Sequence, residues 1–400
     1  MGPSGPAWET HPMTALPRGF SAHVDGIGIK DDTDDFLVLA AERTGPAAAV
    51  FTRSRFVGPS VTLSRANVAD GRLRAVVVVS KNANVATGEQ GSRDAAELAA
   101  GVAAALGCDP GDVLVASTGV IGRPYPMDRV RKKLETLALP FEVTEAEPAA
   151  TAMMTTDTVA KVASATVPAA DGGQATIVGI AKGVGMIEPD MATLLAFFLT
   201  DADIEADALD ATFRRVIDRS LNAVSIDTDT STSDTAAILA SGAAGSVDLD
   251  AFELALDDVA LSLTRQIARD GEGATTLIEV RVDGARDDDQ ARRVAKAIVN
   301  SPLVKTAVHG ADPNWGRVAM AIGKCSDDTD IDQQRVVIRF GADEVYPHLL
   351  DDDSLAALST YLGGDDVLIH VSLGIADGSF TAYGCDLTDG YVRINADYTT

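Results

Sequence analysis

A threonine follows a short, glycine-containing connector near the middle of the chain. The connector begins at Lys182 and contains Gly183 and Gly185, whose backbones can adopt conformations closed to other residues. Apolar segments over 175–181 and 193–199 flank it and predict two buried strands, with a short helix as the alternative for the second. A threonine hydroxyl is a weak nucleophile on its own, but the free α-amine of an N-terminal threonine can act as its base.

This placement suggests that the chain cuts itself. A strained connector can press Thr193 Oγ onto the Ala192 carbonyl, and the resulting ester would hydrolyse. The new chain would begin with Thr193, a nucleophile that carries its own base. Spacing alone favours a simpler interpretation, an ordinary turn followed by a strand residue, because Gly-x-Gly patterns are common.

Two threonine segments lie at the ends of other predicted elements. Thr118 and Gly119 follow a predicted strand over 113–117, where a hydroxyl and an N–H could converge on one oxygen as an oxyanion hole requires. A plain turn is the alternative. Thr155 and Thr156 are candidates for substrate contact, although helix-end capping would explain them equally well.

Carboxylates mark two further segments. Glu272 lies between two glycines at a predicted helix–strand junction, where it could receive an ammonium group or be an exposed turn residue. The segment 225–235 (SIDTDTSTSDT) fails as a calcium loop, because Thr232 stands where the turn glycine belongs and Ile238 where the bidentate glutamate belongs. A hydrogen-bonding scaffold is the better interpretation. His309 has no metal-motif neighbours, and a structural role is expected for it.

The motifs together resemble the ornithine acetyltransferase (glutamate N-acetyltransferase) family. These two-chain enzymes move an acetyl group from N-acetylornithine to glutamate. The resemblance covers nearly the whole chain after Arg18 and includes, in the family's order, ASTGVIG at 116–122, MTTDT at 154–158, KGVGMIEPDMATLLAF from 182, DGEGA at 270–274, HGADPNWGR at 309–317 and RINADYTT at 393–400. The segments EPDMATLL and DTDTSTSDT are most similar to those of family members from clavulanic-acid-type antibiotic gene clusters.

The resemblance implies an α/β fold. The expected architecture is a layered helix/sheet/sheet/helix sandwich, like that of the N-terminal-nucleophile aminopeptidases, with a smaller C-terminal α/β domain. A flexible segment over 1–18 would precede a sandwich domain over 19–280, and the C-terminal domain over 281–400 would return its tail to the active site. The two chains, 1–192 and from 193, would stay associated and form a heterotetramer or a larger assembly.

The resemblance also implies roles for named residues. Thr193 would be the nucleophile, and Thr118 and Gly119 would stabilise the oxyanion. Which of Thr155 and Thr156 contacts the substrate stays open. No metal or organic cofactor is implied. The expected substrate-binding residues are Thr155, Thr156, Lys182, Thr193, Glu272, Asn395 and Thr400.

Composition limits the partners. The net charge of −26 over 400 residues disfavours nucleic acid and anionic membranes, which both need lysine and arginine. Three widely spaced cysteines and the absence of a signal-peptide pattern indicate a cytoplasmic protein. Further strands are expected over 47–53, 74–80, 303–308, 367–373 and 380–385, and helices over 92–106, 127–137, 207–223, 250–268, 287–300 and 353–362.

Two other functions are compatible with the sequence. Water in place of an amine acceptor would make the protein an amidohydrolase or aminopeptidase. An uncut chain would be a non-catalytic amino-acid-binding protein. The sequence also leaves open whether the pathway is arginine or antibiotic biosynthesis, and whether acetyl-CoA is a second donor.

Overall fold

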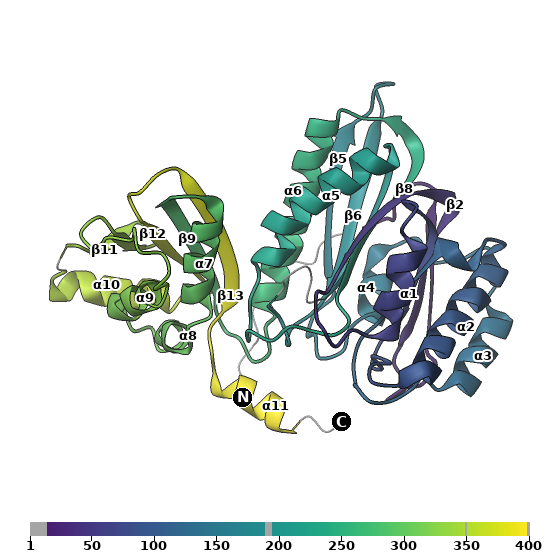
Figure 1. Ribbon diagram of the computed structural model, residues 1–400, viewed down its shortest axis with the longest axis horizontal. Helices are drawn as coiled ribbons and strands as arrows, with labels where there is room; N and C mark the ends of the chain where they lie inside the picture. The colour runs from purple at the N-terminus through teal and green to yellow at the C-terminus, as the bar shows by residue number, and fades with distance from the viewer. Residues whose placement is uncertain (1–13, 189–193, 349, 398–400) are drawn as a thin grey trace.

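The computed structural model describes residues 14–188, 194–348 and 350–397. It contains a larger body and a smaller body, joined along the helix α6 (Figure 1). The larger body contains β1 (Phe20–Asp25), β2 (Phe36–Phe51), α1 (Pro59–Asn67), β3 (Arg72–Val79), α2 (Gly88–Leu106), β4 (Val113–Ser117), α3 (Met127–Thr136), α4 (Ala146–Ala152), β5 (Lys161–Pro168), β6 (Gln174–Lys182), β7 (Leu195–Asp203), α5 (Ala206–Arg219), β8 (Thr235–Ser246) and α6 (Leu249–Arg269).

The long strand β2 joins two halves of the sheet in the larger body. Its first part pairs with β3, and its register shifts between Ala40 and Gly45. Its last part, Ala47–Phe51, pairs with β8. The strand order is β4-β3-β2-β8-β7-β6-β5, with β1 added to β2. The two halves face each other, because Leu37 of the first half and Phe197 of the second belong to the same buried cluster.

Helices cover both outer faces of these halves. Val77 of the first half packs in one cluster with Leu98 of α2. On the second half, the rings of Phe198 and Phe213 of α5 meet edge to face with their centroids 5.6 Å apart. Figure 1 shows α2 and α3 on the side of the larger body away from α6. Alternating strand residues thus fill three apolar layers, and the predicted helix/sheet/sheet/helix sandwich is confirmed.

The smaller body is a second α/β unit. It contains β9 (Leu277–Ala285), α7 (Asp288–Val299), α8 (Pro302–His309), α9 (Trp315–Gly323), β10 (Val337–Phe340), β11 (Asp343–Tyr346), α10 (Asp352–Leu362), β12 (Asp366–Ser372) and β13 (Gly378–Cys385). Its sheet has the order β11-β10-β12-β9-β13. The division proposed at residue 280 stays a prediction, and β9 crosses this position.

The predicted strand over 303–308 is wrong, because this segment is the helix α8. Ser301 caps the helix by accepting a hydrogen bond from Val304 N at 3.4 Å, and Pro302 occupies its first turn. The signals for the start of a helix therefore outweigh the β-branched composition, which favours a strand. His309 ends this helix, and its Nδ1 lies 2.9 Å from Asp386 Oδ2.

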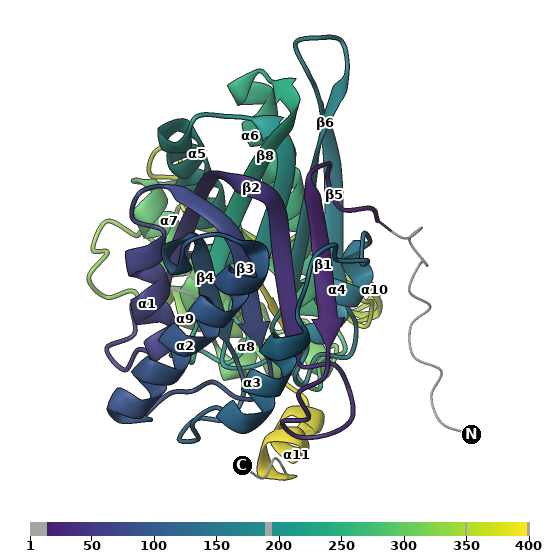
Figure 2. The same ribbon diagram turned by 90° about the vertical axis from the view of Figure 1, so that its right-hand side faces the viewer.

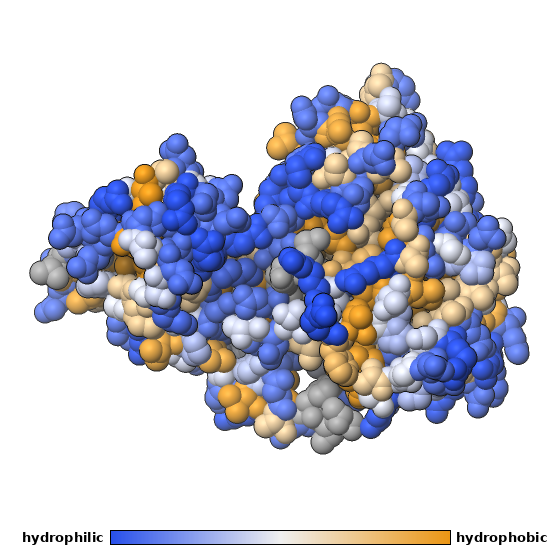
Figure 3. Space-filling model, in the orientation of Figure 1, coloured by the Kyte–Doolittle hydropathy of each residue, from blue (hydrophilic) through white to orange (hydrophobic). Residues whose placement is uncertain are grey.

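After β13 the chain returns toward the larger body as the helix α11 (Asp389–Asp397), which lies beneath both bodies (Figures 1 and 2). Thr388 Oγ1 donates a hydrogen bond to Gly273 O at 2.7 Å and fixes the start of this return. Hydrophilic residues cover most of the face in Figure 3. No helix in the described part of the chain is long and apolar enough to cross a bilayer.

Candidate functional site

A cavity of about 210 Å³ lies where β4, β6 and β7 approach the loop after α6. Leu194, directly before β7, lines it. Ala192, Thr193 and Thr400 lie outside the described residues. Seven residues with predicted roles surround the cavity, namely Thr118, Gly119, Thr155, Thr156, Lys182, Glu272 and Asn395.

Lys182 connects two of the threonines. Its Nζ donates hydrogen bonds to Thr155 Oγ1 at 2.9 Å and to Thr118 Oγ1 at 3.3 Å. An ammonium group can only donate, so both hydroxyls accept in these contacts. Each hydroxyl therefore keeps its own hydrogen for an oxygen atom of a ligand.

Asp157 holds the end of β6 in place. Its Oδ1 accepts from Gly183 N at 2.7 Å and from Lys161 Nζ at 2.9 Å. Burial by itself would raise the pKa of Asp157, but Lys182 and Lys161 outweigh it and lower the pKa to about 2. Burial lowers the pKa of Lys182, and the Asp157 carboxylate, 4.0 Å away, opposes that shift. Asp270, which accepts from Lys161 Nζ at 2.6 Å, completes this buried network.

Gly119 is required by the turn after β4. Its φ is +125°, a conformation that L side chains rarely adopt. A Cβ atom at this position would lie 2.3 Å from the Lys81 carbonyl carbon. The absence of a side chain therefore lets the backbone of this turn pack closely against the end of β3 while Thr118 faces the cavity.

Glu272 supplies a carboxylate on another side of the cavity. Its Oε1 accepts from Thr156 Oγ1 at 3.0 Å, and its Oε2 accepts from Asn395 Nδ2 at 2.8 Å. Gly185 leaves room for it, because a Cβ there would lie 2.7 Å from the carboxylate carbon. The cavity thus contains a cation, Lys182, and an anion, Glu272, which suits a ligand with both a carboxylate and an ammonium group.

Four polar residues of the cavity were not predicted to line a site. Ser231, Thr232, Ser233 and Asp234 belong to the segment that was interpreted only as a hydrogen-bonding scaffold. The Asp234 side chain is buried, its Oδ2 has no hydrogen-bond partner among the described residues, and burial raises the pKa of this carboxyl well above its usual value. Sequence spacing carried no signal for this role, since the β7–β8 pairing brings the residues to the cavity.

Comparison with known proteins decides the family. Residues 21–400 match the ArgJ family. The chain belongs to the ArgJ family. It is 60% identical over 390 residues to glutamate N-acetyltransferase Oat2 of Streptomyces clavuligerus, covering 96% of this chain and 98% of the relative. It is 52% identical over 387 residues to the arginine biosynthesis bifunctional protein ArgJ 2 of a Nostoc species, covering 97% and 99%.

A solved structure, the ArgJ protein of Bacillus halodurans, is 41% identical and covers 50% of this chain and 98% of its own, with a TM-score of 0.47. The family resemblance expected from the motifs is confirmed, and the match to Streptomyces clavuligerus Oat2 agrees with the finer resemblance. The role of each individual residue stays a prediction.

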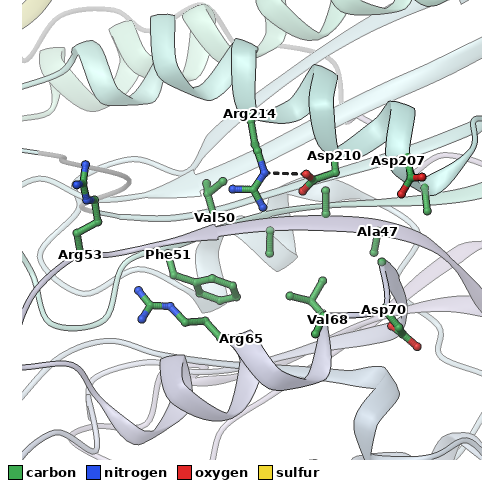
Figure 4. A pocket seen from close by; sticks show the side chains of 15 residues that line it. Ala47, Val50, Phe51, Arg53, Arg65, Val68, Asp70, Asp207, Asp210 and Arg214 are labelled. Carbon is green, nitrogen blue, oxygen red and sulfur yellow. Dashed lines mark hydrogen bonds and ion pairs between the residues drawn. The ribbon is translucent and has the colours of Figure 1, made fainter.

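A larger hollow of about 700 Å³ lies between α1 and α5 in this ArgJ family member, with Ala47–Phe51 as its floor (Figure 4). Arg65 lies 5.8 Å from the Phe51 ring centroid, and Arg214 pairs with Asp210 at 2.7 Å. None of the residues with predicted roles lines this hollow.

Within the described residues, no cluster of three or more His, Cys, Asp or Glu could hold a metal ion.

Proposed function

We propose that this chain is a glutamate N-acetyltransferase that transfers an acetyl group from N-acetylornithine to glutamate. The observation that carries the proposal is the pairing of Lys182 and Glu272 in one cavity beside two hydroxyls whose hydrogens are available to a ligand. Both substrates are amino acids with a carboxylate and an amine-derived group. The relatives named as glutamate N-acetyltransferase and ArgJ support the same activity.

The active form arises by self-cleavage between Ala192 and Thr193. The strands before and after this bond, β6 and β7, are antiparallel neighbours, and Lys182 pairs with Leu195. The backbone hydrogen bonds of this pair and the buried layers on both faces keep chains 1–192 and 193–400 together after the cut.

The first half-reaction makes an acetyl-enzyme. Thr193 Oγ attacks the acetyl carbonyl of N-acetylornithine, and the Thr193 α-amine accepts the hydroxyl proton. The Thr118 hydroxyl and the Gly119 N–H donate to the oxyanion, a contribution of about 3–4 kcal/mol per donor. The C–N bond between the acetyl group and ornithine breaks, and the proton held by the α-amine moves to the departing nitrogen. Ornithine then dissociates, and the acetyl group remains on Thr193 as an ester.

Glutamate then enters and takes the acetyl group by the reverse steps. Lys182 binds a substrate carboxylate, which matters in a protein of net charge −26. Glu272 binds the ornithine side-chain amine, and Thr155 or Thr156 contacts the amino-acid backbone. Asn395 and Thr400 close the cavity. The scheme needs no metal or organic cofactor.

The two chains would assemble as a heterotetramer or larger in the cytoplasm, within arginine biosynthesis or a specialised antibiotic pathway. The test of function is a comparison of two rates with purified protein and N-acetylornithine. We expect N-acetylglutamate to form faster in the presence of glutamate than acetate is released in its absence. Faster acetate release would indicate an amidohydrolase, and an intact chain that binds ornithine without turnover would indicate a binding protein.

A further inference from the structure

The segment Ser225–Thr235, which no predicted function explained, contacts the chain on both sides of residues 189–193. Upstream, Asp227 Oδ2 accepts from Met186 N at 2.6 Å, and Asp227 Oδ1 accepts from Ile187 N at 2.7 Å. Downstream, Thr235 N donates to Leu194 O at 2.9 Å. One segment therefore holds both ends of the connection between β6 and β7.

The upstream contact is continuous along the backbone. Glu188 N donates to Asp229 O at 2.9 Å, and Ile226 N donates to Ile187 O at 2.7 Å. The three consecutive N–H groups of residues 186–188 thus all donate to residues 227–229. Two of these three bonds end on the single carboxylate of Asp227, so removal of that carboxylate would release two of the three N–H groups.

The held backbone is strained. Met186 has a φ of +57°, in the left-handed region that non-glycine residues seldom occupy. Hydrogen bonds from backbone N–H groups to an ionised carboxylate are among the stronger ones in proteins. The two bonds to Asp227 therefore stabilise a conformation that residues 186–187 would not keep unaided.

The smaller body adds a second anchor. Asn300, directly after α7, donates from Nδ2 to Glu188 Oε1 at 2.8 Å. Lys296 of the same helix donates from Nζ to Val224 O at 2.7 Å, next to the start of the 225–235 segment. The position of residues 186–188, which directly precede residues 189–193, thus depends on contacts with both bodies.

We propose that Asp227 is a positioning residue for self-cleavage and that Asn300 assists it through Glu188. The inference rests on the cut proposed above between Ala192 and Thr193. Asp227 is not among the residues that line the substrate cavity, and neither is Asn300. Their role is to fix the direction from which the chain approaches the cleaved bond, so their loss should slow processing.

The test follows freshly translated precursor by intact-mass spectrometry over time. Asp227→Asn keeps the size of the side chain but replaces one acceptor oxygen by an NH₂ group, which cannot accept from Met186 N or Ile187 N. We expect cleavage to slow by about tenfold or more. Asn300→Ala should slow it by roughly threefold, because it removes a single, partly buried hydrogen bond near the low end of the usual range.

The matched control is Asp218→Asn. Asp218 of α5 forms an ion pair with Arg292 of α7 at 2.6 Å, so it also links the two bodies but does not contact residues 186–188. Its precursor should be cut at the wild-type rate. Once cut, the Asn300→Ala enzyme should show the wild-type kcat. A general folding defect would instead lower both the rate of self-cleavage and kcat.

Wild-type cleavage of the Asp227→Asn precursor would overturn the inference. Folding is checked by comparing the thermal melting of the double variant Asp227→Asn/Thr193→Ala with that of Thr193→Ala alone. The Thr193→Ala change keeps both samples uncut. If Asp227→Asn fails to fold, Asn300→Ala decides, and an unchanged rate there overturns the inference. A wild-type chain that is never cut would instead refute the proposed self-cleavage.

Discussion

Asn395 Nδ2 lies 2.8 Å from Glu272 Oε2, although 123 residues separate the two in sequence. The contact brings the C-terminal helix α11 to the wall of the cavity, where Glu272 also accepts from Thr156. The helix α11 thereby contributes Asn395 to the lining of the cavity. The orientation of the Glu272 carboxylate depends on both partners.

Asn395→Ala should weaken substrate binding without removing the chemistry. The loss of one partly exposed hydrogen bond to a carboxylate costs about 1 kcal/mol, so KM for N-acetylornithine should rise roughly fivefold while kcat changes little. Steady-state kinetics measures both constants. Arg393→Ala is the control, because Arg393 of the same helix forms an ion pair with the exposed Asp389 at 2.8 Å and does not line the cavity. Equal effects of the two variants would contradict the role given to Asn395.

Asp157 makes stability depend on pH at the acidic end. Its pKa is about 2 in the folded protein and about 3.9 in an unfolded chain. A carboxyl with a lowered folded-state pKa stabilises the fold above about pH 4, and this contribution is lost as the pH falls through about 2. Asp157→Asn should therefore cost about 3 kcal/mol in urea unfolding at pH 7 and clearly less at pH 3. The same loss at both pH values would contradict this account.

Asp234 should show the opposite behaviour. Burial raises its pKa in the folded protein, whereas the unfolded chain loses the proton above about pH 4. Ionisation then favours the unfolded state progressively as the pH rises above that value. Asp234→Asn should raise Tm by at least about 2 °C at pH 7 and leave it nearly unchanged at pH 3. A lower Tm of the variant at pH 7 would show that the carboxyl has an ionic partner in the fold.

Gly185→Ala tests the packing of Glu272. The added Cβ would lie 2.7 Å from the carboxylate carbon, so the side chain must move away from Thr156 and Asn395. We expect kcat/KM to fall by about tenfold or more, with little change in Tm. Gly323→Ala lies at the end of α9, where the new Cβ would meet no described atom within 4 Å apart from its chain neighbours and the backbone of its own helix, so it should leave kcat/KM unchanged. Activity of Gly185→Ala near that of the wild type would argue against a fixed Glu272.

Many strands and turns could be predicted from the sequence because they depend on local patterns, whereas the sandwich and the set of site residues followed from the resemblance to the family. The β-branched run in β3 and the glycine-bearing turn at Gly119 each carry a signal in a few adjacent residues. The family motifs likewise marked Lys182 and Glu272. The error at α8 arose where the cap of Ser301 outweighed a strand-like composition.

The contribution of Asp227 and Asp234 could not be predicted in the same way. Both act through the pairing of β8 with β7 and through the packing of the 225–235 segment on residues 186–188. Such long-range contacts leave no periodic trace. Once the spacing excludes a calcium loop, the dense carboxylates of this segment indicate only a hydrogen-bonding scaffold.

The most direct test of the account is intact-mass spectrometry of the purified protein, with and without N-acetylornithine, beside Thr193→Ala. We expect two fragments, the second beginning at Thr193 and gaining the mass of one acetyl group when N-acetylornithine is added. Glutamate should then remove that mass, and Thr193→Ala should stay whole and unmodified. A single full-length chain in the wild type, or cleaved chains that never gain an acetyl group, would contradict the proposed mechanism.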